Sequence, residues 1–290
     1  MVEDIVDLLV CPVCRDDLAL RPGVLRCARG HSFDVARQGY VSLLTGSRAP
    51  GTADTAAMVA ARERFLGAGH YAPLAGRLAE VVRAALPAST GATPPGEREG
   101  GPGGTVVDAG AGTGYYLAAA LTGRARGVAL DISKYAARRA ARAHPRIGAV
   151  VADLWRPLPL RDACADVVIN VFAPRNGPEF ARVLRPGGRL VVVTPERGHL
   201  DPLVGLLGLL SVDEDKERRV ARSLGAWFRE VDRGREGFSM SLGPEAVEAA
   251  VSMGPSAWHA DPEPLRERIG ALPNPVTVTA SFRVSVFERA

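Results

Sequence analysis

The chain has 290 residues, 47% of them hydrophobic and 23% charged, which is enough to bury one main domain and a smaller second one. No apolar run approaches the length of about 18 residues that a membrane span needs. The start, M-V-E-D-I-V-D, is acidic, unlike the basic opening of a secretory signal. These features predict a cytoplasmic protein that does not cross a membrane.

The basic residues are unusual in kind. The net charge is +4, and 34 of the 36 basic residues are arginine, leaving only Lys134 and Lys216. Guanidinium groups pair with phosphate through a planar fork and stack on bases, which suits an RNA partner. Because alanine, glycine and proline are also abundant, a GC-rich genome is an equally good explanation of the arginine content.

The first residues carry a pattern typical of a metal site. Cys11 and Cys14 form a C-x-x-C pair, and Cys27 and His31 follow after a loop of twelve residues. Three thiolates and one imidazole are the ligands of a closed, tetrahedral structural zinc site, whose binding energy would help so small a module to fold. The alternatives are unrelated cysteines or a redox pair, but no βαβ pattern surrounds the C-x-x-C motif. Cys164 is expected to be an ordinary small residue.

A helix and a loop are predicted next. From Asp54, the expected N-cap, apolar residues recur at helical spacing until Gly67 and Gly69 end the helix. Residues 88–104, A-S-T-G-A-T-P-P-G-E-R-E-G-G-P-G-G, are rich in proline and glycine and predict a flexible surface loop.

The most informative stretch is T-V-V-D-A-G-A-G-T-G-Y-Y-L, from Thr105 to Leu117. Branched residues run into Asp108 and then into glycines 110, 112 and 114, as in a buried parallel strand that ends in a turn and opens a helix. Glycines allow a cofactor to approach the backbone closely. The G-x-G-x-G spacing and the preceding acid disfavour a pyrophosphate and favour a cationic or amino-acid-like ligand. A simple tight βα turn is the alternative.

Four further strands are predicted to end in polar residues at one edge of the same sheet. The carboxyl edge of an open α/β sheet is where such folds bind ligands, and Asp131 lies where an acid can accept hydrogen bonds from a ribose. The strands and their polar ends are Arg126 to Leu130 with Asp131, Ala149 to Ala152 with Asp153, Val167 to Val171 with Asn170 and the segment 172–176, and Arg189 to Val193 with Thr194.

The end of the chain completes the pattern. A leucine-rich helix is predicted over 196–210, with His199 at its start, and the charged run 213–222 reads as a solvated helix face. Strands at 231–242 and 276–287 flank two helices, Pro244 to Met253 and Pro262 to Leu272, and would add an antiparallel hairpin to a seven-stranded sheet.

With these elements in order, and with A-R-V-L-R-P-G-G-R-L-V-V-V at 181–193, the chain resembles the class I S-adenosylmethionine (AdoMet) methyltransferases. Five further features limit the resemblance to a smaller group of these enzymes. They are the zinc pattern, F-D-V-A-R-Q-G-Y-V (33–41), M-V-A-A-R-E-R-F-L-G-A-G-H-Y (58–71), V-F-A-P-R-N (171–176) and S-M-G-P-S-A-W (252–258). Over nearly its whole length the chain resembles the bacterial 23S rRNA (guanine-N1)-methyltransferases, and within them the actinobacterial macrolide-resistance branch.

This resemblance implies an organisation and a site. The fold would be α/β, a Rossmann-like class I methyltransferase domain at 105–290 behind a zinc-ribbon module for RNA recognition at 1–45 and a helical connection at 46–87. AdoMet and zinc would be the cofactors, hairpin 35 of 23S rRNA near the peptide exit tunnel the partner, with a homodimer left open, and resistance to 16-membered macrolides such as tylosin or mycinamicin the result. AdoMet would be held by Tyr71, Asp108, Gly110, Gly112, Thr113, Gly114, Tyr115, Asp131, Asp153 and His199.

The acceptor side is less defined. Guanine N1 carries a proton that must leave, and the pattern does not single out a base. Asn170, Phe172 and Arg175 are the acceptor-side candidates, Phe172 by stacking and Arg175 by meeting phosphate. A packing role for Phe172, and a capping or core role for His199, are the alternatives. Methylation of a small metabolite or of another rRNA or tRNA base, and a non-catalytic RNA-binding role, also remain open.

Overall fold

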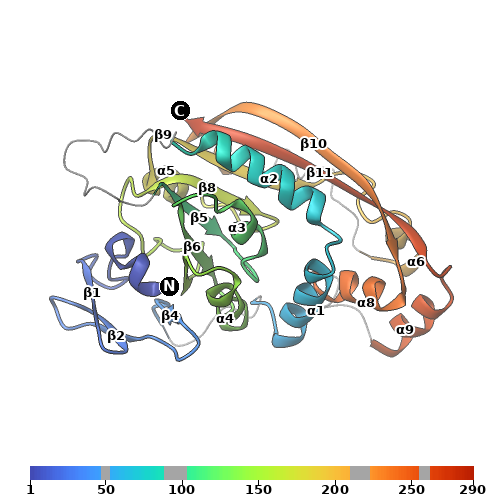
Figure 1. Ribbon diagram of the computed structural model, residues 1–290, viewed down its shortest axis with the longest axis horizontal. Coiled ribbons are helices and arrows are strands. Elements are labelled where there is room, and N and C mark those ends of the chain that lie inside the picture. Colours follow the sequence, from blue (N-terminus) through green and yellow to red (C-terminus); the bar gives the residue numbers. More distant parts are fainter. Residues whose placement is uncertain (47–52, 88–102, 210–222, 255–261) are drawn as a thin grey trace.

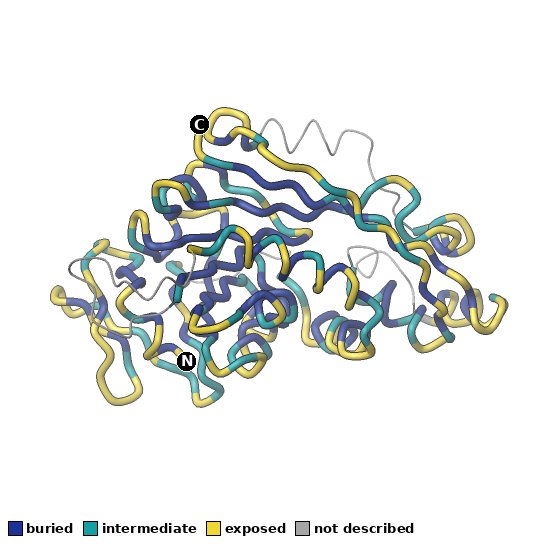
Figure 2. Tube along the Cα trace, turned by 45° about the horizontal axis from the view of Figure 1, so that its top comes forward, coloured by how far each residue is buried: buried dark blue, intermediate teal, exposed yellow. Residues whose placement is uncertain are grey.

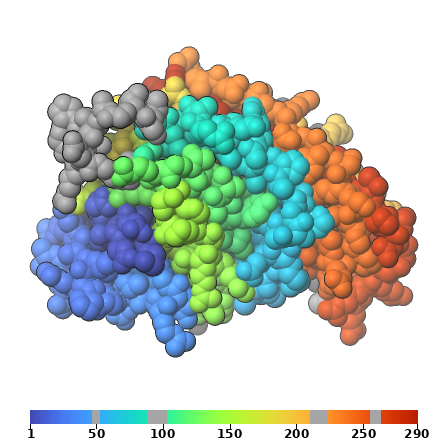
Figure 3. All heavy atoms as spheres, in the orientation of Figure 1, coloured from blue at the N-terminus to red at the C-terminus, as the bar shows by residue number. Residues whose placement is uncertain are grey.

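The structure is a computed structural model that describes residues 1–46, 53–87, 103–209, 223–254 and 262–290 (Figure 1). Most of the predicted loop at 88–104, the charged run at 213–222 and residues 255–258 of the S-M-G-P-S-A-W motif lie outside these ranges. The first residues of the chain and the C-terminal helices occupy opposite ends of the molecule, with the glycine-loop region between them (Figure 3).

The N-terminal module begins with two short 3₁₀ turns, η1 (Val2–Asp4) and η2 (Val6–Leu8). A three-stranded antiparallel sheet follows, formed by β1 (Leu18–Arg21), β2 (Val24–Cys27) and β3 (Ser32–Asp34). Gly23 and Gly30 stand at φ values of +74° and +86° between these strands, in the left-handed region that glycine adopts without strain. Glycine at these two positions predicts the turns of short hairpins, and the structure confirms both.

The described part of the chain contains a second sheet of eight strands in the order β10-β11-β9-β8-β5-β6-β7-β4. Its central strands are parallel, while β11 runs antiparallel to both β9 and β10, which confirms the predicted class I fold and its C-terminal hairpin. The strands are β4 (Tyr40–Ser42), β5 (Thr105–Ala109), β6 (Arg126–Asp131), β7 (Ile147–Val151), β8 (Ala165–Val171), β9 (Leu184–Pro195), β10 (Phe228–Leu242) and β11 (Val276–Arg289).

The eighth strand was not predicted. β4 belongs to the N-terminal module, yet it pairs in parallel with β7, Tyr40 standing opposite Ala149. The packing is equally close, because a Cβ added to Gly148 on β7 would lie 2.3 Å from Cγ1 of Ile5. The module and the sheet therefore share structure instead of meeting through a linker.

The helices that flank the sheet are α1 (Ala56–Gly67), α2 (Ala72–Ala85), α3 (Tyr115–Ala120), α4 (Lys134–Ala143), α5 (Gly177–Val183), α6 (Leu203–Leu207), α8 (Pro244–Ser252) and α9 (Pro262–Gly270). The side chain of Thr55, not of Asp54 as predicted, caps α1 by accepting a hydrogen bond from the backbone N–H of Met58 (3.2 Å). The Asp54 carboxylate instead pairs with Arg62.

Two further predictions were wrong in detail. The helix expected over 196–210 is reduced to the five residues of α6, because Gly198 and Leu200 have positive φ and Pro202 has no N–H to donate. In addition, the Pro-Gly-Gly sequence at 186–188, which predicts a turn between a helix and a strand, forms a bulge within β9: Ala165 pairs with Leu184 but Val167 pairs with Arg189.

The core has two buried clusters, one on each face of the large sheet. Val106 belongs to one and its neighbour Val107 to the other, as the period of two in a strand requires. Residues of α2, α3 and α8 complete the first cluster, and residues of the N-terminal turns and α5 complete the second. The central strands are accordingly the most continuously buried part of the chain (Figure 2).

Candidate functional site

The four predicted zinc ligands are brought together. The ligand atoms of Cys11, Cys14, Cys27 and His31 all lie within 4.8 Å of one another. Sγ of Cys14 is 3.7 Å from Sγ of Cys27, and Nδ1 of His31 is 3.6 Å and 3.3 Å from Sγ of Cys11 and Cys27. A tetrahedron with Zn–S bonds of about 2.3 Å has S···S edges of about 3.8 Å, so the cluster fits one zinc ion.

The thiols of this cluster differ in acidity. Desolvation and the neighbouring thiols raise the pKa of Cys14 to about 11. Desolvation also acts on Cys27, but hydrogen bonds involving Cys14 and His31 outweigh it and lower the pKa of Cys27 to about 7. Cys27 is thus ready to bind as a thiolate near neutral pH, and a bound cation would displace the proton of Cys14.

Three arginines close to the zinc ligands in the sequence are candidate phosphate contacts, and all three lie on the surface of this module. Arg26, Arg29 and Arg37 are exposed. The guanidinium of Arg29 also pairs with the carboxylate of Asp16, with Nε 2.9 Å from Oδ2. A surface pair of this kind is weak and exchanges readily for a phosphate.

The glycine loop joins β5 to α3 at the carboxyl edge of the large sheet. The backbone N–H groups of Gly110 and Ala111 both donate to the carbonyl of Leu130 on β6, each at 2.9 Å. Gly110, Gly112 and Gly114 have φ values of +94°, +53° and +78°, so each position strongly disfavours another residue.

The structure corrects the reason given for two of these glycines. A Cβ at Gly110 would lie 2.2 Å from Cβ of Ala173, and a Cβ at Gly114 would lie 2.9 Å from Cα of Ala140. Protein atoms therefore fill the space at both positions. At Gly112 the nearest group is the guanidinium of Arg62, whose Nη1 would lie 3.3 Å from the added carbon.

Asp131 ties the loop to the start of α4. Its two carboxylate oxygens accept hydrogen bonds from the backbone N–H groups of Gly112 and Ser133, both at 2.8 Å. Burial raises its pKa, and these two hydrogen bonds oppose that rise. Each carboxylate oxygen has a second lone pair, so the acid retains capacity to accept from a ribose.

Asp108 is a buried acid that no described side chain or backbone group partners. Its side chain is buried at the end of β5, and neither carboxylate oxygen has a hydrogen-bond partner among the described residues. Burial, reinforced by the charge of Asp131, raises its pKa well above the usual range. A bound ammonium group would satisfy this carboxylate, so the donor set fits the amino-acid end of AdoMet.

Tyr71 and His199, which are both predicted to bind the cofactor, are in contact with each other. The Tyr71 hydroxyl lies 3.2 Å from Nε2 of His199. Both rings pack against Phe282, with centroids at 5.0 Å and 4.6 Å, and Phe282 lies 5.4 Å from Phe172. An aromatic cluster thus links these two residues to the segment after β8.

That segment, residues 170–176, is held firmly. The side-chain amide of Asn170 donates to the carbonyls of Ala109 (2.8 Å) and Pro174 (2.9 Å), while its Oδ1 is buried without a partner in the described ranges. Phe172 has a φ of +55° and is 42% exposed, although it is a large apolar residue. Arg175 is half-buried. The backbone therefore presents Phe172 outward, as stacking on a base would need.

The remaining predicted cofactor residues flank this region. Asp153 follows β7, accepts a hydrogen bond from the N–H of Trp155 (2.9 Å) and pairs with Arg156. Thr113 is buried in the loop, and Tyr115 is half-buried at the start of α3.

Two residues of this region were not predicted. Arg62 on α1 pairs with Asp54, donates to the carbonyl of Met253 (2.8 Å) and lies over Gly112. Tyr116 on α3 has a buried hydroxyl with no partner in the described structure. Arg62 lies within the motif at 58–71, and Tyr116 lies within the glycine-loop stretch at 105–117. Neither motif indicates where these side chains point.

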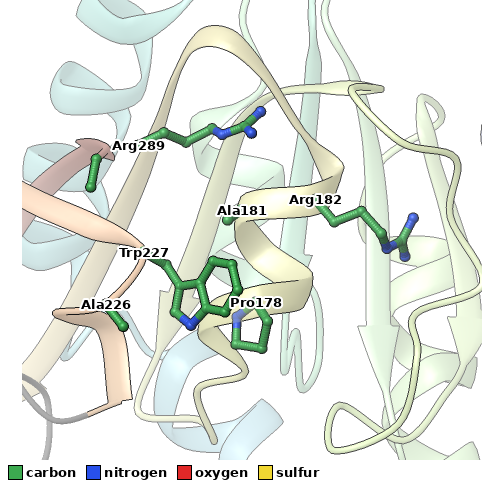
Figure 4. Close-up of a pocket in the computed structure, with 7 residues that line it drawn as sticks. Pro178, Ala181, Arg182, Ala226, Trp227 and Arg289 are labelled. Carbon is green, nitrogen blue, oxygen red and sulfur yellow. The ribbon is translucent and has the colours of Figure 1, made fainter.

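A depression of about 400 Å³ lies elsewhere, between α5 and the end of β11. The Trp227 indole lies against Pro178 there, while Arg182 points away from it (Figure 4). None of the predicted site residues lines it; the lining residues are Pro178, Ala181, Arg182, Ala226, Trp227, Arg289 and Ala290. Within the described ranges, the structure also has no helix that is both long and apolar enough to span a bilayer.

Comparison with known proteins agrees with this architecture. A zinc-ribbon family described as RlmA, N-terminal, matches residues 9–46, and a methyltransferase domain family matches residues 107–192. A 23S rRNA (guanine-N1)-methyltransferase of Micromonospora griseorubida is 53% identical and a 23S rRNA (guanine(748)-N1)-methyltransferase of Streptomyces fradiae is 49% identical, each over 98% of both chains. A relative named for the same activity in Bacillus subtilis is 31% identical over 86% of both chains. A solved type II methyltransferase from Anaeromyxobacter dehalogenans aligns with a TM-score of 0.47 at 22% identity, over 73% of this chain and 94% of that one.

Proposed function

Because the chain belongs to the family of 23S rRNA (guanine-N1)-methyltransferases, we propose that it transfers a methyl group from AdoMet to N1 of a guanine in 23S rRNA. The observation that carries the substrate is the identity of 49% to 53% over 98% of each chain, which includes both the zinc ribbon and the catalytic domain. The zinc cluster and the unpaired acid of the glycine loop support it from the structure.

AdoMet supplies an electrophilic methyl group on a sulfonium. The chain's own residues then have to hold that group in line with the acceptor nitrogen and exclude water. Asp108 would hold the ammonium of the amino-acid end, and Asp131 would hold the ribose hydroxyls. The loop at 110–115 would contact the part of the cofactor that lies between these two groups. Tyr71, Asp153 and His199 would complete the cofactor site.

The acceptor would enter beside residues 170–176. Duplex RNA hides N1 in base pairing, so the guanine must be unpaired or extruded to reach the site. Phe172, which is exposed on a strained backbone, would stack on the base, and Arg175 would meet a phosphate. The buried Oδ1 of Asn170 would accept a hydrogen bond from the guanine edge.

We assign the target to the guanine that corresponds to position 748, the base in the name of the Streptomyces fradiae relative. We further propose that this guanine lies in hairpin 35, near the peptide exit tunnel, and that its methylation confers macrolide resistance. The resemblance to the macrolide-resistance branch of the family supports both points. A methyl on N1 adds bulk and removes a hydrogen-bond donor, so a drug packed against that base binds less tightly. Macrolides of 16 members whose sugars reach the hairpin should be affected most.

Expression in a macrolide-sensitive host that lacks its own guanine-N1 methyltransferase tests this proposal. Primer extension should stop at the target guanine, because N1-methylation blocks the pairing edge, and resistance to tylosin or mycinamicin should rise. A methyl at another base or on a free metabolite would overturn the substrate. Correct methylation without resistance would overturn only the biological role.

A further inference from the structure

The hydroxyl of Tyr116 is a buried polar group that no described residue partners. Tyr116 is the second residue of α3, and only 8% of it is exposed. Its hydroxyl has no hydrogen-bond partner among the described residues. The ring packs edge-to-face against Phe172, with centroids 6.3 Å apart, and against Tyr115 at 5.2 Å. The ring alone therefore accounts for the packing.

A phenylalanine would make the same ring contacts without burying an unpaired oxygen. Leaving a buried hydroxyl unsatisfied costs free energy in the protein without ligand, and native structures contain few such groups. The cost is recovered if a ligand pairs with the hydroxyl. This points to a bound partner that the described part of the chain does not supply.

The surroundings of Tyr116 define the chemistry of that partner. Burial raises the pKa of Tyr116 well above the usual range, and the nearby Tyr71, Tyr115 and Asp108 raise it further. The positive charge of Arg62 opposes this rise. The hydroxyl therefore stays protonated and can donate. Asp108, within electrostatic reach, has two oxygens unpaired among the described residues, and both accept hydrogen bonds once the carboxyl is ionised beside a bound cation.

An α-amino acid end has matching groups of both kinds. Its ammonium donates to an unpaired carboxylate, and its carboxylate accepts from an unpaired hydroxyl. Asp108 stands just before the glycine loop and Tyr116 just after it, so the two groups flank the loop that the cofactor must meet. Arg62, which lies over Gly112, adds a cation on the side where a carboxylate would be stabilised.

We propose that Tyr116 is a cofactor-binding residue whose hydroxyl donates a hydrogen bond to the carboxylate of the methionine end of AdoMet, while Asp108 accepts from its ammonium. This rests on the use of AdoMet in the proposed function and adds a residue to its site. It is independent of the RNA base that is methylated.

The test uses Tyr116→Phe in the full chain and two ligands, measured by calorimetry. S-adenosylhomocysteine carries the amino-acid end, whereas 5′-methylthioadenosine lacks it. The variant should bind S-adenosylhomocysteine about tenfold less tightly, because it loses one hydrogen bond to a charged group. Its affinity for methylthioadenosine should be unchanged. Tyr135→Phe, which alters an exposed tyrosine, is the control and should change neither.

Thermal unfolding of the ligand-free variant gives a second readout. An unchanged or higher Tm supports the proposal, because the lost hydroxyl had no partner; a clear fall would show that the hydroxyl has a structural role and overturn it. Equal weakening of both ligands, or of neither, would also overturn it. If both ligands bind normally but the methylation rate falls, the hydroxyl serves the acceptor instead. If the unmodified protein did not methylate a guanine of 23S rRNA, the proposed function would be overturned. The calorimetric test of Tyr116 would remain valid.

Discussion

The hydroxyl of Tyr71 lies 3.2 Å from Nε2 of His199, although 128 positions separate the two residues in the sequence. Nδ1 of His199 accepts a hydrogen bond from the backbone N–H of Ser281 (3.3 Å), so in the neutral ring the proton is on Nε2. Nε2–H then donates to the Tyr71 oxygen. The Tyr71 hydroxyl hydrogen is left to point toward a further acceptor.

We expect these two residues to act as one unit in cofactor binding. Tyr71→Phe and His199→Ala should each weaken AdoMet, and the double variant should lose less than the sum of the two. The interaction free energy should be about 0.5–1.5 kcal/mol, typical of one hydrogen bond. Calorimetry on the four proteins measures it, and additive losses would mean that the two side chains act independently.

Asp108→Asn should stabilise the protein while impairing its cofactor site. The folded-state pKa of Asp108 is raised, so the folded protein holds its proton more tightly than the unfolded chain does. Its contribution to stability therefore falls as pH rises from about 3.9, the usual pKa of an aspartate, toward the folded value. At neutral pH the variant should gain about 1–3 kcal/mol of unfolding free energy.

Denaturant unfolding across pH 4 to 8 without ligand measures this gain. The difference between Asp108→Asn and the unmodified protein should widen as pH rises, and AdoMet affinity should fall at least tenfold. A loss of stability at neutral pH would show that Asp108 has a partner in the ligand-free protein.

Asp131→Ala should weaken AdoMet at least tenfold, because it removes an acceptor for two ribose hydroxyls, each bond contributing about 1.5–3 kcal/mol. Since Asp131 also accepts from Gly112 and Ser133, the glycine loop should lose stability too. Asp131→Asn keeps one acceptor oxygen, so its AdoMet affinity should lie between those of the unmodified protein and Asp131→Ala. Unchanged affinity in both variants would remove Asp131 from the cofactor site.

Zinc removal should affect more than the N-terminal module. Metal analysis should find one zinc per chain, and a chelator or Cys14→Ser should destabilise residues 1–46 by several kcal/mol, since ligation and folding are linked. Because β4 pairs with β7, hydrogen exchange should also accelerate at Ile147–Val151 while β5 and β9 keep their protection. Cys164→Ser is the control. Protein purified without chelator and free of zinc would contradict the site.

The sequence predicted most of this architecture because the large elements are long and periodic. The strands ending at Asp131 and Val171 and the zinc spacing depend on local patterns that tertiary contacts did not override. The pairing of β4 with β7 escaped prediction because three residues carry too little periodicity to assign a partner. Side-chain contacts, such as Arg62 over Gly112 or the unpaired Tyr116 hydroxyl, depend on how helices dock, which no spacing encodes.

The last prediction separates RNA binding from cofactor binding. Arg26, Arg29 and Arg37 are exposed on the N-terminal module, at the opposite end of the molecule from the C-terminal helices (Figure 3). Changing all three to alanine should weaken binding to a 23S rRNA hairpin fragment and lower the slope of log K against log salt by about one for each phosphate that is no longer neutralised. AdoMet affinity should not change. The matched control replaces Arg229, Arg235 and Arg266, which are 72%, 78% and 67% exposed and each pair with a glutamate. Equal losses in both triple variants would show that net charge alone drives RNA binding. Loss of AdoMet affinity in the first variant would contradict the division of roles between the N-terminal module and the cofactor site.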